Sequence, residues 1–204
     1  MKVGIFGGTF DPPHVGHLLA ASDAFDALGL QRLLFVPNAR QPLKTDILQS
    51  TPEDRLAMVK LAVADDARFD VDPLEVERGG MSFSVDTLEA MAERAPDDER
   101  FFLVGADAGH TFAQWKAPQR IGELARLAVL QRALDSGDRP GDEEARAGIV
   151  AVIGPKAPPP VMLRTRRVDV SSTEIRVRVR DGRSIHGFVP EAVARFIHER
   201  GLYR

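Results

Sequence analysis

The sequence predicts an α/β protein: a doubly wound, Rossmann-like parallel sheet with a small C-terminal helical part. First, an apolar run at residues 3–6 is followed by a loop, by apolar residues at helical spacing through 15–28, and by a second apolar run at 33–36. Second, this strand–helix–strand order is a βαβ unit, which implies parallel strands with ligands bound beyond their carboxyl ends. We expect a single domain over residues 1–204, in which residues 171–204 form the helical part.

Composition narrows the class of protein. The chain has 204 residues, 44% of them hydrophobic, which is enough for a sizeable core. Its 27 basic and 30 acidic residues leave a net charge of -3, so we expect no nucleic-acid and no membrane partner. The absence of cysteine excludes disulfides and thiolate chemistry. No stretch reaches the about 18 apolar residues of a membrane span, and no signal-peptide core is present, which favours a cytoplasmic protein.

The loop between the first predicted strand and helix carries a dense polar pattern. Gly7 and Gly8 have no Cβ, so the turn can bend sharply and a phosphate can approach the backbone amides. His14 and His17 stand three residues apart at the start of the helix, which puts both imidazoles on one side, where the helix dipole favours an anion. Loop histidines beside a glycine pair also occur on ordinary surfaces, so the pattern alone leaves both interpretations open.

Two later segments bring polar groups to the same edge of the sheet. Lys44, in a polar loop at 37–50, either leans over the site or is a solvated loop lysine. A helix predicted over 52–64 has only a structural role. Ser84 is expected to cap a helix over roughly 85–94, whose first amides suit a carboxylate or a phosphate and serve equally well as a simple helix start.

The next strand ends add three candidate side chains. A β-like run at 101–104 precedes Asp107, which could accept a ribose hydroxyl or cap a helix. Trp115, the only tryptophan, could stack on a planar ring or simply pack. A strand at 127–130 precedes Arg132, which stands just past its end. All three would lie at the carboxyl edge of a parallel sheet.

The remaining pattern is less informative. Residues 135–148 are rich in charge and glycine and predict an exposed loop or a short helix. Residues 149–153 predict a buried strand, and a further strand is expected near 161–169. Residues 190–200 predict a helix. We assign no chemistry to these segments.

The segment after the last predicted strand gives conflicting local signals. Ser171 and Glu174 fit a capping box, which predicts that a helix follows, whereas residues 175–180 alternate strictly, as in a strand. We predict the helix because Ile175 and Val179 also fall four residues apart. Several arginines lie in this region, but no aromatic residue accompanies them to stack on bases, so nucleic-acid binding is not expected.

A helix in this place creates a second candidate anion site. Ser172 and Thr173 would supply hydroxyl and amide donors at the helix N-terminus, and Arg176 would add a guanidinium about one turn further on. The alternative is a well-capped surface helix with solvated arginines.

Two motifs, separated by most of the chain, resemble the signatures of one family. The run from Gly7 to His17 contains His14-Val15-Gly16-His17 and resembles the H-x-G-H signature of a nucleotidyltransferase superfamily. Its Gly-Gly-Thr-Phe-Asp-Pro form is similar to that of the bacterial nicotinate mononucleotide adenylyltransferases. Residues 170–176 resemble the I-S-S-T-x-I-R signature of the superfamily, and residues 82–88 resemble the S-Y-T-x-D-T-L element of this branch. The resemblance covers nearly the whole chain.

The resemblance implies a reaction and its partners. The AMP moiety of ATP would be transferred to nicotinate mononucleotide, giving deamido-NAD and pyrophosphate. Mg²⁺ would be carried with ATP, and a homo-oligomer is allowed. Two alternatives stay open: a related adenylyltransferase that acts on nicotinamide mononucleotide or phosphopantetheine, and a non-catalytic nucleotide-binding module.

Carried onto this sequence residue by residue, the resemblance implies three groups of site residues. The catalytic group is His14, His17, Lys44 and Arg176. The nucleotide-binding group is Gly7, Gly8, Thr9, Phe10, Ser172 and Thr173. The substrate-binding group is Ser84, Asp107, Trp115 and Arg132, and no resident metal ligand is expected.

Overall fold

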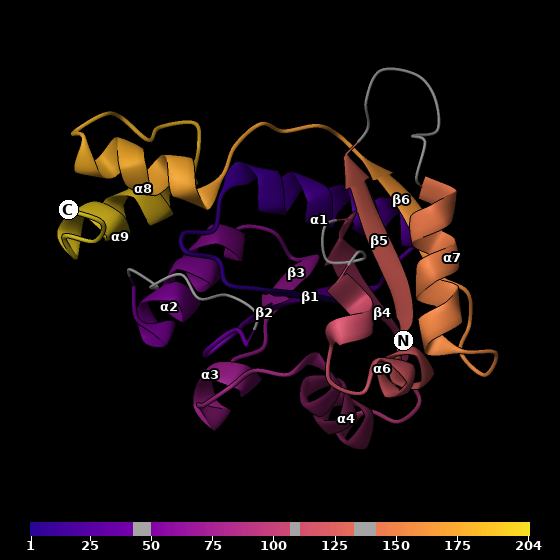
Figure 1. Cartoon of the computed structure of the whole chain (residues 1–204). Coiled ribbons are helices and arrows are strands. Elements are labelled where there is room, and N and C mark those ends of the chain that lie inside the picture. Colours follow the sequence, from indigo (N-terminus) through magenta and orange to yellow (C-terminus); the bar gives the residue numbers. More distant parts are fainter. Residues whose placement is uncertain (43–49, 107–110, 133–141) are drawn as a thin grey trace.

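The computed structural model describes residues 1–42, 50–106, 111–132 and 142–204. Within these ranges a sheet of six parallel strands runs in the order β3-β2-β1-β4-β5-β6 (Figure 1). The strands are β1 (Lys2–Gly8), β2 (Arg32–Pro37), β3 (Phe69–Val71), β4 (Glu99–Gly105), β5 (Arg126–Arg132) and β6 (Val161–Thr165). The predicted doubly wound parallel sheet is confirmed.

Helices cover both faces of this sheet and form a separate group at the C-terminus (Figure 1). None of those within the described ranges is long and apolar enough to cross a lipid bilayer. The helices are α1 (Val15–Leu28), α2 (Pro52–Val63), α3 (Leu74–Arg78), α4 (Ser84–Arg94), the 3-10 helix η1 (Phe112–Gln114), α6 (Pro118–Leu124), α7 (Asp142–Ile153), α8 (Ser172–Arg180) and α9 (Glu191–Glu199).

Alternating side chains of the central strands feed two cores. Phe6 of β1 and Phe101 of β4 point to the face covered by α1 and α2. Ile5 and Phe102, their neighbours along the same strands, point to the face covered by α4, α6 and α7. Both faces are therefore apolar, as expected for a parallel sheet that is buried on both sides.

The chain reverses its winding direction beside β1. β1 pairs with β2 on one side and with β4 on the other, so helices that follow these strands leave to opposite faces. In an open parallel sheet this reversal leaves a crevice beyond the carboxyl ends of the two strands. β1 ends at Gly8 and β4 ends at Gly105, so both strands end at this crevice.

The C-terminal helices form a third core against α2, which lies beside them in Figure 1. Ser171 caps α8, and its hydroxyl accepts a hydrogen bond from the Glu174 amide at 3.1 Å. The helix predicted there is confirmed, and so is the one predicted over 190–200. Within the alternating run, Ile175 is fully buried, whereas Arg176 and Arg178 are partly buried and Arg180 is exposed.

The strand predicted over residues 149–153 is wrong. These residues form the last turn of α7, which buries Ile149 and Ile153 on one side and leaves Val150 exposed. A short apolar run satisfies the strand and the buried-helix pattern equally well. The strand next to β5 is instead β6, which ends at Thr165 and is shorter than the predicted 161–169.

The predicted cap at Ser84 is wrong by one residue. Phe83 occupies the N-cap position, without a side-chain cap, and Ser84 is the first residue of α4. The Thr87 hydroxyl in the same turn donates to the Glu75 carboxylate at 2.6 Å and lies 3.4 Å from the Phe83 carbonyl. Glu75 of α3 thus ties the first turn of α4 to the neighbouring helix.

Tyr203 fastens the C-terminal helices to the first loop of the chain (residues 9–14). Its buried hydroxyl donates to the Asp11 carboxylate at 2.7 Å, and the Ser50 hydroxyl donates to the same oxygen. Burial and the Asp11 charge raise the pKa of the Tyr203 phenol well above its usual value. The phenol therefore acts as a permanent donor at neutral pH.

We predict that Tyr203→Phe lowers the free energy of unfolding by about 2 kcal/mol, because it removes a hydrogen bond to a buried carboxylate while keeping the ring. Denaturant unfolding at neutral pH measures this loss. Leu202→Met is the matched control, since it changes the adjacent side chain at nearly constant volume and keeps the Tyr203 hydroxyl. Equal stability of Tyr203→Phe and the wild type would contradict the prediction.

The raised pKa gives a second measurement on the same pair. In the unfolded chain the phenol ionises at about pH 10, whereas the folded protein holds its proton to higher pH. The Tyr203 contribution is therefore complete below about pH 10 and declines as the pH rises above it. The stability difference between the wild type and Tyr203→Phe should shrink in that alkaline range.

Candidate active site

The first loop turns sharply where β1 ends. Phe10 has a φ of 52°, and its ring is buried between Phe6 and Phe35. A Cβ on Gly8 would lie 2.7 Å from Cζ of Phe10, so only glycine fits at this position. The ring of Phe10 thus supports the turn from below, and only the backbone of this predicted nucleotide-binding residue is left to face a ligand.

His14 and His17 lie together at the N-terminus of α1. His14 is the N-cap, and the two rings stack with their centroids 3.7 Å apart. The His14 amide donates to Nδ1 of His17 at 3.2 Å, so a neutral His17 ring carries its proton on Nε2 and presents a donor there. A Cβ on Gly16 would lie 3.0 Å from Nδ1 of His14. Gly16 therefore leaves the space that the stacked rings need.

Arg55 of α2 holds the first loop to the segment that follows β2. It is fully buried, and Nη1 donates to the carbonyls of Thr9 at 2.9 Å and Asn38 at 2.6 Å. Nη2 donates to the Ala39 carbonyl at 2.8 Å. Burial lowers the pKa of Arg55, and the nearby Asp11 charge opposes this shift.

Sequence reasoning missed Arg55, because α2 was expected to be only structural. One signal was present: Arg55 stands four residues before Val59, on the apolar stripe of the helix. A charged residue on the buried side of a helix needs polar partners inside the protein. An arginine on the buried side of a predicted helix therefore indicates that backbone carbonyls of neighbouring loops accept hydrogen bonds from it.

The N-terminus of α8 contacts the first loop directly. The Ser172 hydroxyl donates to the Pro12 carbonyl at 2.8 Å, and Nη1 of Arg176 donates to the Asp11 carbonyl at 2.8 Å. Nη2 of Arg176 donates to the Thr173 hydroxyl at 3.1 Å. Two motifs from opposite ends of the chain thus form one continuous group of hydrogen-bond donors.

A pocket of about 500 Å³, including space open to solvent, lies on the other side of the crevice, where α4 begins. We call it the aromatic pocket. Its described lining residues are Gln41, Pro42, Ser82, Phe83, Ser84, Gln114, Trp115, Lys116 and Ile121. The predicted substrate-binding residues Ser84 and Trp115 thus meet in one pocket, whereas Gln114 and Lys116 did not emerge from the sequence.

Aromatic packing fixes the position of Trp115. Its ring lies 6.2 Å from Phe102 of β4 in an edge-on arrangement and 5.4 Å from Phe112 in a tilted one. Both partners are buried in the core. Trp115 is therefore held on the core side while it lines the pocket, as a stacking platform requires.

A buried network supports the opposite wall of the aromatic pocket. The Ser82 hydroxyl accepts from the Ala39 amide at 3.0 Å, and the Ser82 amide donates to the Arg40 carbonyl at 2.8 Å. Behind them Glu75 is buried, and burial raises the pKa of its carboxyl. The Thr87 hydroxyl donates a hydrogen bond to Glu75 and so ties this carboxyl to α4.

Three predicted site residues cannot be placed in full. Lys44 and Asp107 lie outside the described residues. Arg132 is the last residue of β5, where it pairs with Thr165, and its side chain is likewise not described. Gly7 and Gly8 close β1 at the crevice, and Thr9 follows them, with its hydroxyl donating to Gln41 at 3.1 Å.

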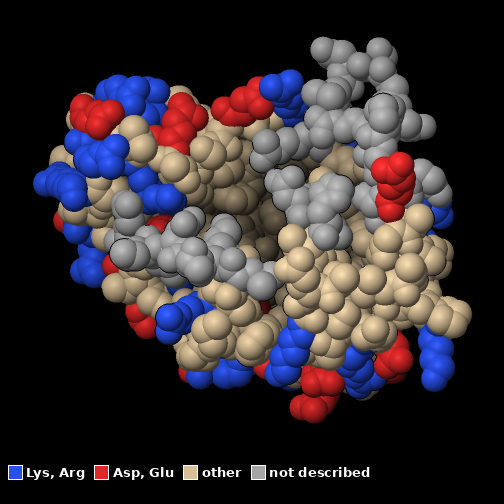
Figure 2. Space-filling view, viewed as in Figure 1, with Lys and Arg blue, Asp and Glu red and all other residues tan. Residues whose placement is uncertain are grey.

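The arrangement has two chemically different halves. Figure 2 shows a hollow in the face viewed, between the C-terminal helices and the half of the molecule that carries β4 and β5. Imidazole, guanidinium, hydroxyl and helix N-terminal donors gather where the first loop meets α8, which suits a polyanion. The aromatic pocket suits a flat ring. Among the described residues no group of three or more His, Asp or Glu side chains could hold a metal ion.

Similar folds occur in solved structures. The structure described as Plasmodium falciparum nicotinic acid mononucleotide adenylyltransferase complexed with NaAD superposes with a TM-score of 0.77 over 99% of this chain and 97% of that one. The two sequences are 16% identical, so this likeness concerns the fold.

Sequence comparison identifies the family. A family model described as Cytidylyltransferase-like matches residues 5–178. A probable nicotinate-nucleotide adenylyltransferase of Gemmatimonas aurantiaca is 50% identical over 208 residues, which span 100% of this chain and 93% of that protein. One of the same description from Thermus thermophilus is 44% identical over 206 residues, covering 100% of both. The chain therefore belongs to the nicotinate-nucleotide adenylyltransferases, nucleotidyltransferases of NAD biosynthesis within the cytidylyltransferase-like family.

Proposed function

We propose that this chain, as one nucleotidyltransferase domain over residues 1–204, transfers AMP from ATP to the phosphate of nicotinate mononucleotide. Pyrophosphate leaves, and the other product is deamido-NAD. The observation that carries the proposal is the direct contact of the first loop with the N-terminus of α8, which combines two groups of anion donors beside an aromatic pocket. The names of the full-length relatives support the choice of acceptor.

The reaction needs alignment and charge stabilisation rather than a covalent enzyme intermediate. The acceptor phosphate is already an anion, so one of its oxygens attacks the α-phosphorus of ATP while the bond to the β-phosphate oxygen breaks. Negative charge then accumulates on the departing pyrophosphate. Fixed donors aimed at those oxygens stabilise the transition state more than the bound substrates.

His14 and His17 are proposed to contact the α- and β-phosphate oxygens. The orientation of His17 supports this role, because its Nδ1 accepts from the His14 amide, which puts the donor of a neutral ring on Nε2. The stacked rings also keep both imidazoles at the helix N-terminus, where an anion is favoured.

The remaining donors are proposed to hold the rest of the nucleotide. Lys44, Thr173 and Arg176 would bind the triphosphate, with Ser172 beside them. Arg176 donates one hydrogen bond from Nη1 to the Asp11 carbonyl and one from Nη2 to the Thr173 hydroxyl. A guanidinium has five N–H donors, so others can bind phosphate. The turn built from Gly7, Gly8, Thr9 and Phe10 would offer its backbone to the nucleotide.

The aromatic pocket is proposed to take the pyridine ring. Trp115 would stack on it, and the start of α4 at Ser84 would offer its amides to the carboxylate. By resemblance Asp107 would bind a ribose hydroxyl and Arg132 the acceptor phosphate.

Mg²⁺ is proposed to enter as part of the ATP substrate. Its preferred oxygen ligands would come mainly from the phosphates and water, in keeping with a described site that offers no cluster of carboxylates. A homo-oligomer and a cytoplasmic location stay predictions from the sequence.

We predict that the purified chain, supplied with ATP and Mg²⁺, releases pyrophosphate fastest when nicotinate mononucleotide is the acceptor. Parallel assays with nicotinamide mononucleotide and phosphopantetheine compare kcat/KM for the three acceptors. A preference for either of the latter two would exclude the proposed acceptor. Nucleotide binding without pyrophosphate release from any acceptor would favour the non-catalytic module.

We predict that His17→Ala lowers kcat/KM by on the order of 10²-fold or more, because it removes a donor that acts on charge developing in the transition state. Steady-state pyrophosphate release measures the loss. His198→Ala is the matched control: this histidine is exposed on α9, where its Nδ1 lies 3.4 Å from Nη2 of Arg204, and its loss should leave the rate unchanged. Nearly full turnover by His17→Ala would refute the role assigned to the imidazole.

A further inference from the structure

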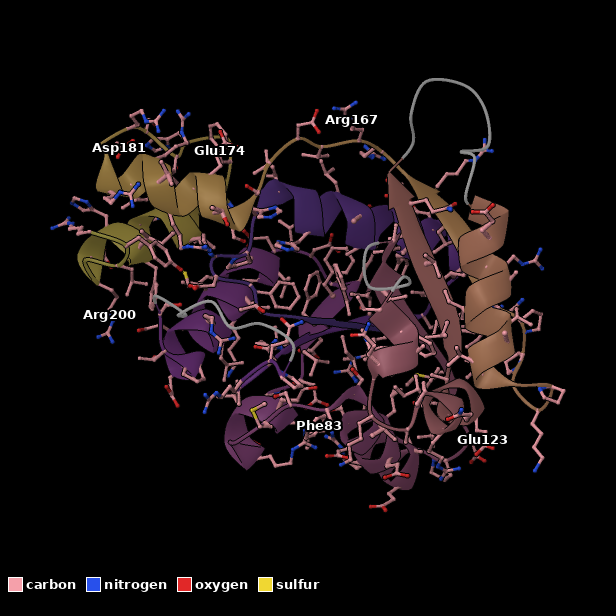
Figure 3. All side chains as sticks on the ribbon, viewed as in Figure 1. Phe83, Glu123, Arg167, Glu174, Asp181 and Arg200 are labelled. Atoms are coloured by element: carbon pink, nitrogen blue, oxygen red, sulfur yellow. The ribbon has the colours of Figure 1, made fainter. Side chains whose placement is uncertain are left out.

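Lys116 brings a positive charge to the aromatic pocket. It is the one charged residue among the described residues that line the aromatic pocket. Its Nζ lies 4.7 Å from the centre of the Phe83 ring, which belongs to the same lining. Figure 3 labels Phe83 where the chain enters α4. The ammonium group therefore stands at the wall of the pocket, over an aromatic face that attracts a cation.

Asp86 holds this ammonium group in place. Nζ of Lys116 donates to the two carboxylate oxygens of Asp86 at 2.7 and 3.1 Å. Asp86 lies in the first turn of α4 and is absent from the described lining of the pocket. A ligand in the pocket would thus contact Lys116, whereas Asp86 would lie behind the ammonium group.

The charge of Lys116 distinguishes two ligands that are otherwise alike. A pyridine ring with a carboxylate and one with a carboxamide have nearly the same shape and can stack equally on Trp115. They differ by one negative charge, which a nearby ammonium group attracts. Half of the Lys116 side chain is exposed, so water screens this attraction and limits its size.

We propose that Lys116 is a specificity-determining residue that favours an acceptor with a carboxylate over the same acceptor with a carboxamide. This inference rests on the proposed function and adds a side-chain contribution to it. Asp86 works in the opposite direction: it keeps Lys116 over Phe83, but its own charge weakens the attraction for an incoming carboxylate.

The test is the ratio of kcat/KM for nicotinate mononucleotide to kcat/KM for nicotinamide mononucleotide. Lys116→Met, which keeps an apolar chain of similar length, should lower this ratio about threefold to fivefold. Lys116→Arg keeps the charge and should retain most of the ratio. The loss in Lys116→Met should appear in KM for nicotinate mononucleotide, with KM for ATP unchanged, and should diminish as salt is added.

Arg120→Met is the matched control. Arg120 of α6 makes an ion pair with Glu89 of α4 at 3.1 Å, just as Lys116 makes one with Asp86. The two cations are equally exposed, at 49% and 50%, but only Lys116 lines the pocket. Loss of Arg120 should therefore leave the acceptor ratio unchanged. A fall as large as that of Lys116→Met would reduce the effect to packing between the two segments.

Asp86→Asn gives a change of opposite sign. It removes the counterion and keeps a side chain of the same shape, so the ratio should rise above that of the wild type. An unchanged ratio in Lys116→Met, a fall in Lys116→Arg as large as in Lys116→Met, or a fall in Asp86→Asn would each overturn the inference. A wild-type protein that uses neither pyridine nucleotide would instead overturn the proposed function, so the two failures are distinguishable.

Discussion

A buried guanidinium holds the nucleotide edge of the sheet together. The carbonyls of Thr9, Asn38 and Ala39 lie beyond the ends of β1 and β2, and Arg55 donates to all three. Buried carbonyls without a donor cost free energy, and so does a buried cation without acceptors. Both costs are offset only when the carbonyls of the two loops accept hydrogen bonds from the same guanidinium. The positions of both loops are therefore fixed by one side chain of α2.

The first loop transmits this constraint to the end of the chain. The Asp11 carboxylate accepts the hydroxyls of Tyr203 and Ser50, while its carbonyl accepts Arg176. One residue thus joins the C-terminal helices, the start of α2 and the N-terminus of α8. The donors that would surround a triphosphate come from both ends of the sequence, so the polyanion half of the site is complete only when the C-terminal helices are docked.

The sequence predicted those elements whose conformation is decided by residues close together in the chain. The apolar run in β1, glycine at its end and the Ser171 cap of α8 each act within a few residues, and the structure agrees with them. The run at 149–153 was misassigned because its pattern suits a strand and a buried helix equally, and tertiary packing made the choice. Arg55 was missed because its acceptors lie 16, 17 and 46 residues away in sequence. Lys116 was missed because its partners, Phe83 and Asp86 at the start of α4, lie about 30 residues earlier in the sequence.

One segment sets the distance between the two halves of the site. Residues 38–41 contact Arg55 and the first loop on one side, since Gln41 accepts from the Thr9 hydroxyl. On the other side the Ala39 amide donates to Ser82, and Gln41 itself lines the aromatic pocket. An in-line transfer requires the acceptor phosphate and the α-phosphorus to meet within a narrow range of geometry. A segment that hydrogen-bonds to both halves provides this alignment before either substrate binds, which gives a reason for the buried polar contacts around residues 38–41.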